Sequence, residues 1–271
     1  MPSKKTLSFL LPITLVFTSS LFSQNYTWPT DAGQVLTSTF CEYRPGHLHA
    51  GIDVKTWGRT GFKVFAIDSG YISRIRVSPY GYGKALYLKL NNGMTAVYAH
   101  LSGFSPAVEQ YVKSIQIKKQ TYSIDNFPGR EALPVNKGDL IAFTGVTGTS
   151  APHLHFEVRD SRNRPVNPLK LGYRIIDTRA PEFTDLALIP LSDHGHIAGD
   201  FQPAVFGVIR AGNNFWKVKD IIEIWGSAGF GVSLHDRADG AWNPFAPHKV
   251  SLFVDDSLIF TTTYSNFSYS D

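Results

Sequence analysis

The stretch HLHFEV at residues 153–158 alternates polar and apolar side chains directly after a turn rich in Gly, Ser and Pro. Successive side chains of a β-strand point to opposite faces of the sheet. His153 and His155 are therefore expected on one face, with Leu154 and Phe156 on the other. Taken alone, the pair is equally compatible with two solvated histidines, so the remaining chain has to distinguish a site from a polar surface.

Other short runs of β type precede this one at close spacing, and NNG at 91–93 is typical of a hairpin turn between two of them. Glycine (23) and proline (16) are plentiful, and helical periodicity is scarce. These features predict an all-β protein with many turns. Residues 104–134 interrupt the rhythm, and we interpret them as an extra hairpin or lid-like loop.

The sequence pattern changes after residue 172. We expect a first domain over 25–172, a linker over 173–185 rich in breakers, and a second domain over 186–271. The short apolar runs of the last region predict a β-sandwich-like (immunoglobulin-like) domain. It stops without a clear terminal element, so we expect this domain to be incomplete or the chain to be a fragment of a longer protein.

Residues 1–24 have the three-part pattern of a secretory signal peptide, with Lys4 and Lys5 before an apolar run. The run is short for a transmembrane span, so we expect no stable span after cleavage, an uncleaved anchor being the alternative. Cys41 is the sole cysteine, so the exported chain has no internal disulfide. The net charge of +4 falls to +2 without Lys4 and Lys5, and no basic stripe indicates a nucleic-acid partner.

Three histidine-bearing stretches lie in the first domain: HLHAGID at 47–53, VYAHL at 97–101 and PHLHFEV at 152–158. Zinc prefers imidazole nitrogen and carboxylate oxygen, and a catalytic site uses three protein ligands. A His-x3-Asp pair with one later histidine supplies such a set. Ligation by Asp68 or Glu157 is an alternative, although we expect both to form surface pairs.

These stretches resemble those of the lysostaphin/LytM-type zinc metallopeptidases, which have a β-sheet groove. The resemblance covers most of residues 37–169, in TSTFCEYRPGHLHAGIDV, VFAIDSGYISRI, VYAHL, VNKGDLIAFTGVTGTSAPHLHFEVRD and VNPL. By position it implies one Zn²⁺ held by His49, Asp53 and His155. It also implies two unligated active-site histidines, His100 and His153. His49 is preferred over His47 because it has the four-residue spacing to Asp53.

The resemblance implies a zinc-dependent endopeptidase that cuts peptide bonds in peptidoglycan cross-links or stems by attack of zinc-activated water. The signal peptide then predicts the periplasm, or the exterior, of a bacterium. A non-catalytic peptidoglycan-binding regulator, an amidase activator and a metalloenzyme acting on another bond remain alternatives. The second domain is expected to bind cell wall, an envelope protein partner or the groove itself. Tyr43, Arg44 and Tyr98 are candidates for lining the groove, or for surface and packing roles.

Overall fold

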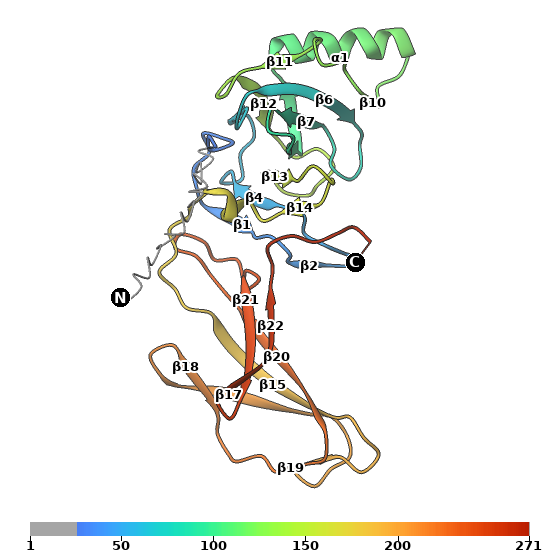
Figure 1. Cartoon of the computed structure of the whole chain (residues 1–271). Helices are drawn as coiled ribbons and strands as arrows, with labels where there is room; N and C mark the ends of the chain where they lie inside the picture. The colour runs from blue at the N-terminus through green and yellow to red at the C-terminus, as the bar shows by residue number, and fades with distance from the viewer. Residues whose placement is uncertain (1–25, 271) are drawn as a thin grey trace, which may run out of the picture.

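The structure is a computed structural model that describes residues 26–270 (Figure 1). The predicted signal peptide lies outside the described residues. Figure 1 shows the first domain at one end of the molecule, the strands β15 to β20 at the other, and the hairpin β21–β22 between them. No helix in the described part of the chain is long and apolar enough to cross a membrane.

The first domain is built on an antiparallel sheet in the order β1-β4-β13-β8-β7-β6-β10, with β14 paired to β13 and β11 paired to β6. Its strands are β1 (Leu36–Ser38), β4 (Ile52–Lys55), β6 (Gly70–Val77), β7 (Ala85–Leu90), β8 (Thr95–Ala99), β10 (Ile124–Asn126), β11 (Pro134–Val135), β13 (His153–Arg159) and β14 (Pro165–Val166). A second sheet has the order β5-β12-β9, and β2 pairs with β3. These elements are β5 (Lys63–Phe65), β9 (Leu101–Phe104), β12 (Leu140–Thr144), β2 (Tyr43–Arg44) and β3 (His47–Leu48).

The alternation along β13 places one face of the strand in the core. Leu154 and Phe156 are fully buried beside Ile52 of β4 and Tyr98 of β8. The expected partition of β13 is therefore confirmed, with its two histidines on the opposite face. Burying the Leu154 and Phe156 side chains contributes about 1.5–3 kcal/mol each, so a one-residue slip of register would be strongly unfavourable. The NNG turn joins β7 to β8, as predicted.

The register of the central strands brings three sequence motifs to one place. His155 pairs with Asp53 of β4 on one side and with Ala99 of β8, the residue before His100, on the other. Gly51 allows this approach, since a Cβ there would lie 2.2 Å from the carbonyl oxygen of Phe156. The small residue between His49 and Asp53 thus permits close packing of the chain entering β4 against β13.

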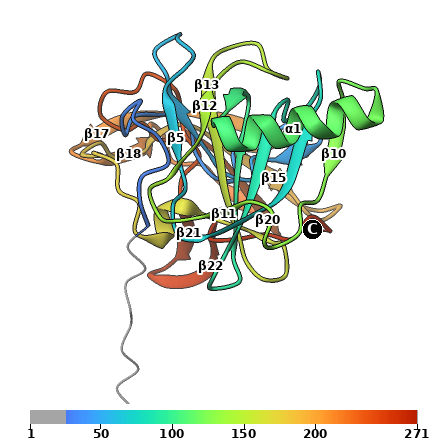
Figure 2. The same ribbon diagram turned by 90° about the horizontal axis from the view of Figure 1, so that it is seen from above.

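The interpretation of residues 104–134 as an extra hairpin or loop is wrong. The segment forms helix α1 (Pro106–Lys119), and β10 and β11 each pair with β6 rather than with one another. Ser105 precedes Pro106 at the first turn, where proline is well tolerated. Val108 and Val112 lie one turn apart and are buried in the core, which anchors the helix. Viewed from above, α1 lies across strands of the first domain (Figure 2).

The chain beyond the first domain adds a sheet in the order β18-β17-β15-β20 and the pairs β16–β19 and β21–β22. Their bounds are β15 (Glu182–Pro190), β16 (His196–Ile197), β17 (Ala204–Gly212), β18 (Phe215–Val218), β19 (Ile224–Trp225), β20 (Ala228–His235), β21 (Lys249–Val254) and β22 (Ser257–Thr263), after a 3₁₀ helix at Pro168–Leu171. The four-stranded sheet and the β21–β22 hairpin line a common hollow of about 940 Å³. The all-β prediction is confirmed, with α1 as the α-helix of the described residues.

Candidate metal centre

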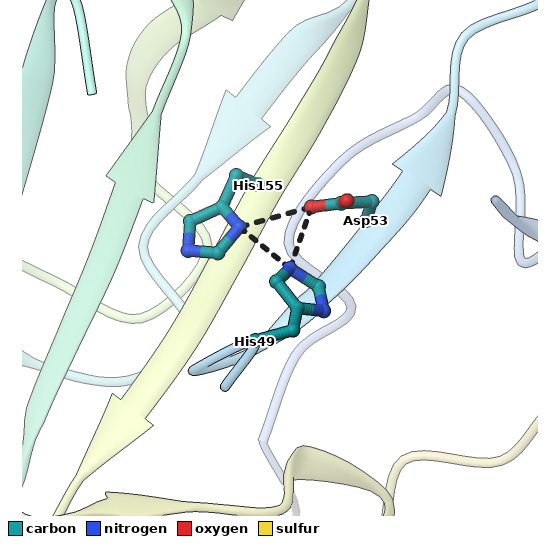
Figure 3. Close-up of side chains that lie close together, drawn as sticks. All are labelled: His49, Asp53 and His155. Atoms are coloured by element: carbon teal, nitrogen blue, oxygen red, sulfur yellow. Dashed lines mark hydrogen bonds and ion pairs between the residues drawn. The ribbon is translucent and has the colours of Figure 1, made fainter. Parts of the chain in front are cut away.

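His49, Asp53 and His155 point toward one another from the chain before β4, from β4 and from β13 (Figure 3). His49 Nε2 lies 3.1 Å from Asp53 Oδ1 and 3.0 Å from His155 Nδ1. The third side of the triangle, from His155 Nδ1 to Asp53 Oδ1, is 2.9 Å. All three residues are buried, with exposed fractions of 6%, 8% and 5%. This is the single group of three such side chains that the described residues bring within metal-binding distance.

Hydrogen bonds on the outer sides of the two rings determine which nitrogens face the centre. His49 Nδ1 lies 2.7 Å from the carbonyl oxygen of Thr39, to which it donates. His155 Nε2 lies 2.9 Å from Glu157 Oε1 and donates to that carboxylate. In the neutral imidazoles the inward nitrogens are then unprotonated, so two lone pairs and a carboxylate oxygen converge. A cation or a proton has to lie among them.

The donor set fits zinc. Two imidazole nitrogens and a carboxylate oxygen are among its preferred ligands, and catalytic sites use three of them. Bonds of about 2.0–2.2 Å separate tetrahedral ligand atoms by roughly 3.3–3.6 Å. This is wider than the 2.9–3.1 Å between the three atoms here, so metal binding would move them slightly apart. His47, the alternative to His49, is exposed in β3 and lies outside the cluster, and the Asp68 carboxylate accepts from the Ser69 amide instead.

The charges around the centre favour a cation. Burial alone would raise the pKa of Asp53, but His155 and His49 hold it well below its ordinary value. Burial alone would lower the pKa of His155, but hydrogen bonds and charge interactions with Asp53 and Glu157 raise it to about 9. The metal-free site therefore retains a proton on His155, and metal binding has to displace that proton.

Glu157 contacts His155 on the side away from Asp53, and the sequence did not predict this role. The expectation that Glu157 forms an ion pair at the surface is wrong. Its side chain is completely buried in β13. The carboxylate accepts from His155 Nε2, from the Tyr82 hydroxyl, and from Arg159 Nε at 2.7 Å. Burial would raise the pKa of Glu157, but His155 and Arg159 lower it to about 2. Glu157 thus holds the His155 ring in orientation and tautomer, as acidic partners of metal-bound histidines do.

His100 and His153 lie beside the cluster with their rings 4.7 Å apart, measured between centroids. His153 Nε2 lies 3.6 Å from Asp53 Oδ1, and its Nδ1 donates to the Ala151 carbonyl oxygen at 2.9 Å. His100 Nδ1 donates to the Thr147 carbonyl oxygen, also at 2.9 Å. In the neutral forms each ring therefore keeps an unprotonated Nε2 that can accept a proton.

The backbone around His100 is strained. His100 has a φ of 58° between β8 and β9, a left-handed conformation that is uncommon outside glycine. Its position is supported by a close approach of two loops, since a Cβ on Gly83 would lie 2.2 Å from the Thr147 carbonyl oxygen. That carbonyl oxygen is the one that accepts from His100. Strain of this kind clusters at functional sites, where the surrounding structure holds it in place.

Burial lowers the pKa of His100 to about 4, against the opposing effect of the Thr147 carbonyl. The pKa of a histidine in the unfolded chain is near 6.5. Because the pKa of His100 is lower than this in the folded chain, His100 stabilises the fold at pH values above about 6.5. This contribution, about 3 kcal/mol, is expected to be lost as the pH falls through about 4. An NMR titration of the ring, assigned with His100→Ala, should show a midpoint well below 6.5. A midpoint at or above 6.5 would contradict the burial argument.

The three residues predicted as candidates for lining the groove, Tyr43, Arg44 and Tyr98, lie in different environments. Tyr98 is fully buried, and its hydroxyl accepts from the Ile67 amide, so it packs in the core. Tyr43 is exposed at the β2–β3 hairpin and lines a pocket with His49 and His155. Arg44 Nη2 lies 3.8 Å from Asp53 Oδ2, beside the centre.

Comparison with known proteins gives relatives for about half of the chain, although no protein-family model matches it. Over 126 residues it is 34% identical to the DD-carboxypeptidase/endopeptidase Mpg of Neisseria meningitidis, covering 46% of this chain and 23% of that protein. Over 145 residues it is 30% identical to the murein hydrolase activator NlpD of Escherichia coli, covering 54% and 30%. A zinc containing peptidase from Vibrio cholerae superposes with a TM-score of 0.38 at 29% identity, covering 52% and 37%.

The homologues of this chain are peptidase domains of the lysostaphin/LytM type, as the histidine motifs predicted. Within that class the curated relatives carry two kinds of name, a peptidase for Mpg and an activator of murein hydrolases for NlpD. The matched region spans less than a third of either relative.

Proposed function

We propose that this chain is a zinc-dependent endopeptidase that hydrolyses peptide bonds in peptidoglycan cross-links or stems, in the bacterial envelope. The observation that carries the proposal is the buried triangle of His49 Nε2, Asp53 Oδ1 and His155 Nδ1, with sides of 2.9–3.1 Å. The similarity to Mpg, whose name describes a carboxypeptidase and endopeptidase, supports the reaction class.

His49, Asp53 and His155 would hold the metal. When bound, zinc supplies Lewis acidity and lowers the pKa of water. His153, with Nε2 3.6 Å from Asp53 Oδ1, lies near the ligand atoms, and we assign to it the acceptance of a proton from water. His100, across a gap of 4.7 Å between ring centroids, donates its Nδ1 proton to the Thr147 carbonyl oxygen. It would stabilise the developing oxyanion or protonate the leaving amine through Nε2, once that atom has taken up a proton. The two roles can be exchanged without changing the chemistry.

Digestion of purified peptidoglycan by the mature protein is expected to release peptide fragments and to stop when a chelator removes the metal. Mass spectrometry of the fragments identifies the bond. His100→Ala and His153→Ala should each retain zinc and lose about 10²–10⁴-fold in rate, because general acid–base catalysis contributes that much. Zinc content measured on the same samples separates this result from loss of the metal. Cleavage that persists with metal-free protein would contradict the proposal.

A second candidate is a non-catalytic activator of murein hydrolases, favoured by the similarity to NlpD. An activator should leave peptidoglycan unchanged alone and accelerate a purified hydrolase when added to it. The His153→Ala variant separates the two functions, since an activator retains its effect without this histidine whereas an endopeptidase loses its activity.

A further inference from the structure

The chain beyond β22 returns from the second domain to the first. Residues 264–270, here called the C-terminal segment, lie against β14 and end beside β2 (Figure 1). The Asn167 amide donates to the Ser265 carbonyl oxygen at 2.8 Å, and the Phe267 amide donates to that of Pro165 at 3.3 Å. Asn266 forms an isolated β-bridge with Val166. The segment therefore docks on β14 through backbone hydrogen bonds, as an added strand does.

Aromatic side chains fix the segment to the first domain. The Phe267 ring packs at 5.5 Å, between centroids, against Phe40, which is buried. The Tyr269 ring lies under the Arg159 guanidinium, with 5.2 Å from the Arg159 Cζ to the ring centroid. Arg159 is the residue that donates to Glu157, so Tyr269 lies beside the network behind His155.

Phe267 and Tyr269 line a small pocket together with two of the three proposed metal ligands. This pocket, of about 360 Å³, is lined by His49, His155, Phe267 and Tyr269 among others. Tyr43 of β2 also lines it, whereas neither His100 nor His153 does. Ligand pockets typically measure about 300–1,000 Å³, so this one has room only for a small group.

We propose that Phe267 and Tyr269 are specificity-determining residues, which close one side of the metal centre and limit the peptide there to small side chains. The proposal rests on the metal site of the proposed function and assigns the subsite on the side away from His100 and His153. The second domain thereby contributes directly to the site, through residues that lie more than 100 positions after the last ligand along the chain.

This subsite is tested by the binding of two hydroxamates of different size, which coordinate the metal, so no catalytic activity is needed for the measurement. Protein loaded with Co²⁺ is titrated with acetohydroxamate and with 2-naphthohydroxamate, and binding is followed by the absorption spectrum of the metal. Tyr269→Ala and Phe267→Ala are expected to bind the naphthyl compound at least tenfold more tightly than the unaltered chain does. Acetohydroxamate affinity should stay within twofold. The control Tyr122→Ala, which removes a tyrosine of similar exposure (62% against 56%), should change neither affinity.

Each other outcome is decisive. Equal naphthyl affinities in the variants and the unaltered chain overturn the subsite while leaving the metal site intact. A matched loss of both affinities in Tyr269→Ala shows that Tyr269 supports the ligands instead of limiting size, and also overturns it. A protein that binds no cobalt contradicts the proposed function, and the subsite with it. Hydrogen exchange at the Asn167 amide supplies an independent measurement, because exchange at the rate of an unstructured peptide excludes docking of the segment.

Discussion

His155→Ala is expected to abolish zinc binding and, with it, the proposed hydrolysis of peptidoglycan. The variant removes one of three buried donors and leaves Glu157 without the imidazole N–H that it accepts at 2.9 Å. Three ligands are the minimum that catalytic zinc sites use, so two leave the metal weakly held. Asp53→Ala and His49→Ala should have the same effect. Zinc content after gel filtration, measured by mass spectrometry of the metal, reports the loss directly.

His47→Ala is the matched control for this prediction, because His47 lies two residues from His49 but is exposed in β3. It should retain one zinc per chain. Full zinc occupancy in His155→Ala, or loss of zinc in His47→Ala, would overturn the assignment of the ligands. Circular dichroism of each variant distinguishes loss of the metal from loss of the fold.

Glu157 is expected to be the residue whose replacement affects both stability and the metal. Glu157→Ala leaves the buried Arg159 guanidinium without its ion pair, which has a distance of 2.7 Å. Breaking a buried pair in this way lowers the free energy of unfolding by about 3–5 kcal/mol. Glu157→Gln keeps the shape but offers one acceptor oxygen to three donors, and should weaken zinc binding by about 10–100-fold.

Chemical denaturation measures the first effect, and competition with a chelator of known affinity measures the second. Glu131→Gln, at an exposed position, is the control and should change neither quantity. If Glu157→Gln bound zinc with unchanged affinity, the carboxylate would stabilise the core without orienting His155.

Much of the first domain was predictable because local pattern and tertiary structure agree there. The alternation along HLHFEV specifies both the strand and the buried face. Leu154 and Phe156 are removed from water only when this face of the strand packs on the core. The NNG turn likewise specifies the β7–β8 hairpin. Helix α1 was missed because its inward face is narrow, with Val108 and Val112 as its buried residues. So short an apolar stripe is easily taken for a loop.

Tyr98 and Tyr43 were both predicted as candidates for lining the groove, and they show why the sequence around a single residue does not predict its burial. Tyr98 and Tyr43 are both aromatic residues near a histidine motif, yet one is fully buried and the other 79% exposed. Tyr98 precedes His100 by two positions, but the positive φ at His100 ends the alternation that would have placed them on one face. Only the surrounding backbone shows that break.

The sequence by itself determined which residues are able to bind a metal, because residue type and spacing fix the donor atoms and the strand face that carries them. The tertiary structure decided the rest. It buried Glu157 behind His155, left His100 uncharged at neutral pH, and brought Phe267 and Tyr269 from beyond β22 to the edge of the site. These outcomes depend on desolvation and on contacts between segments more than 100 residues apart in the chain, which no local pattern encodes.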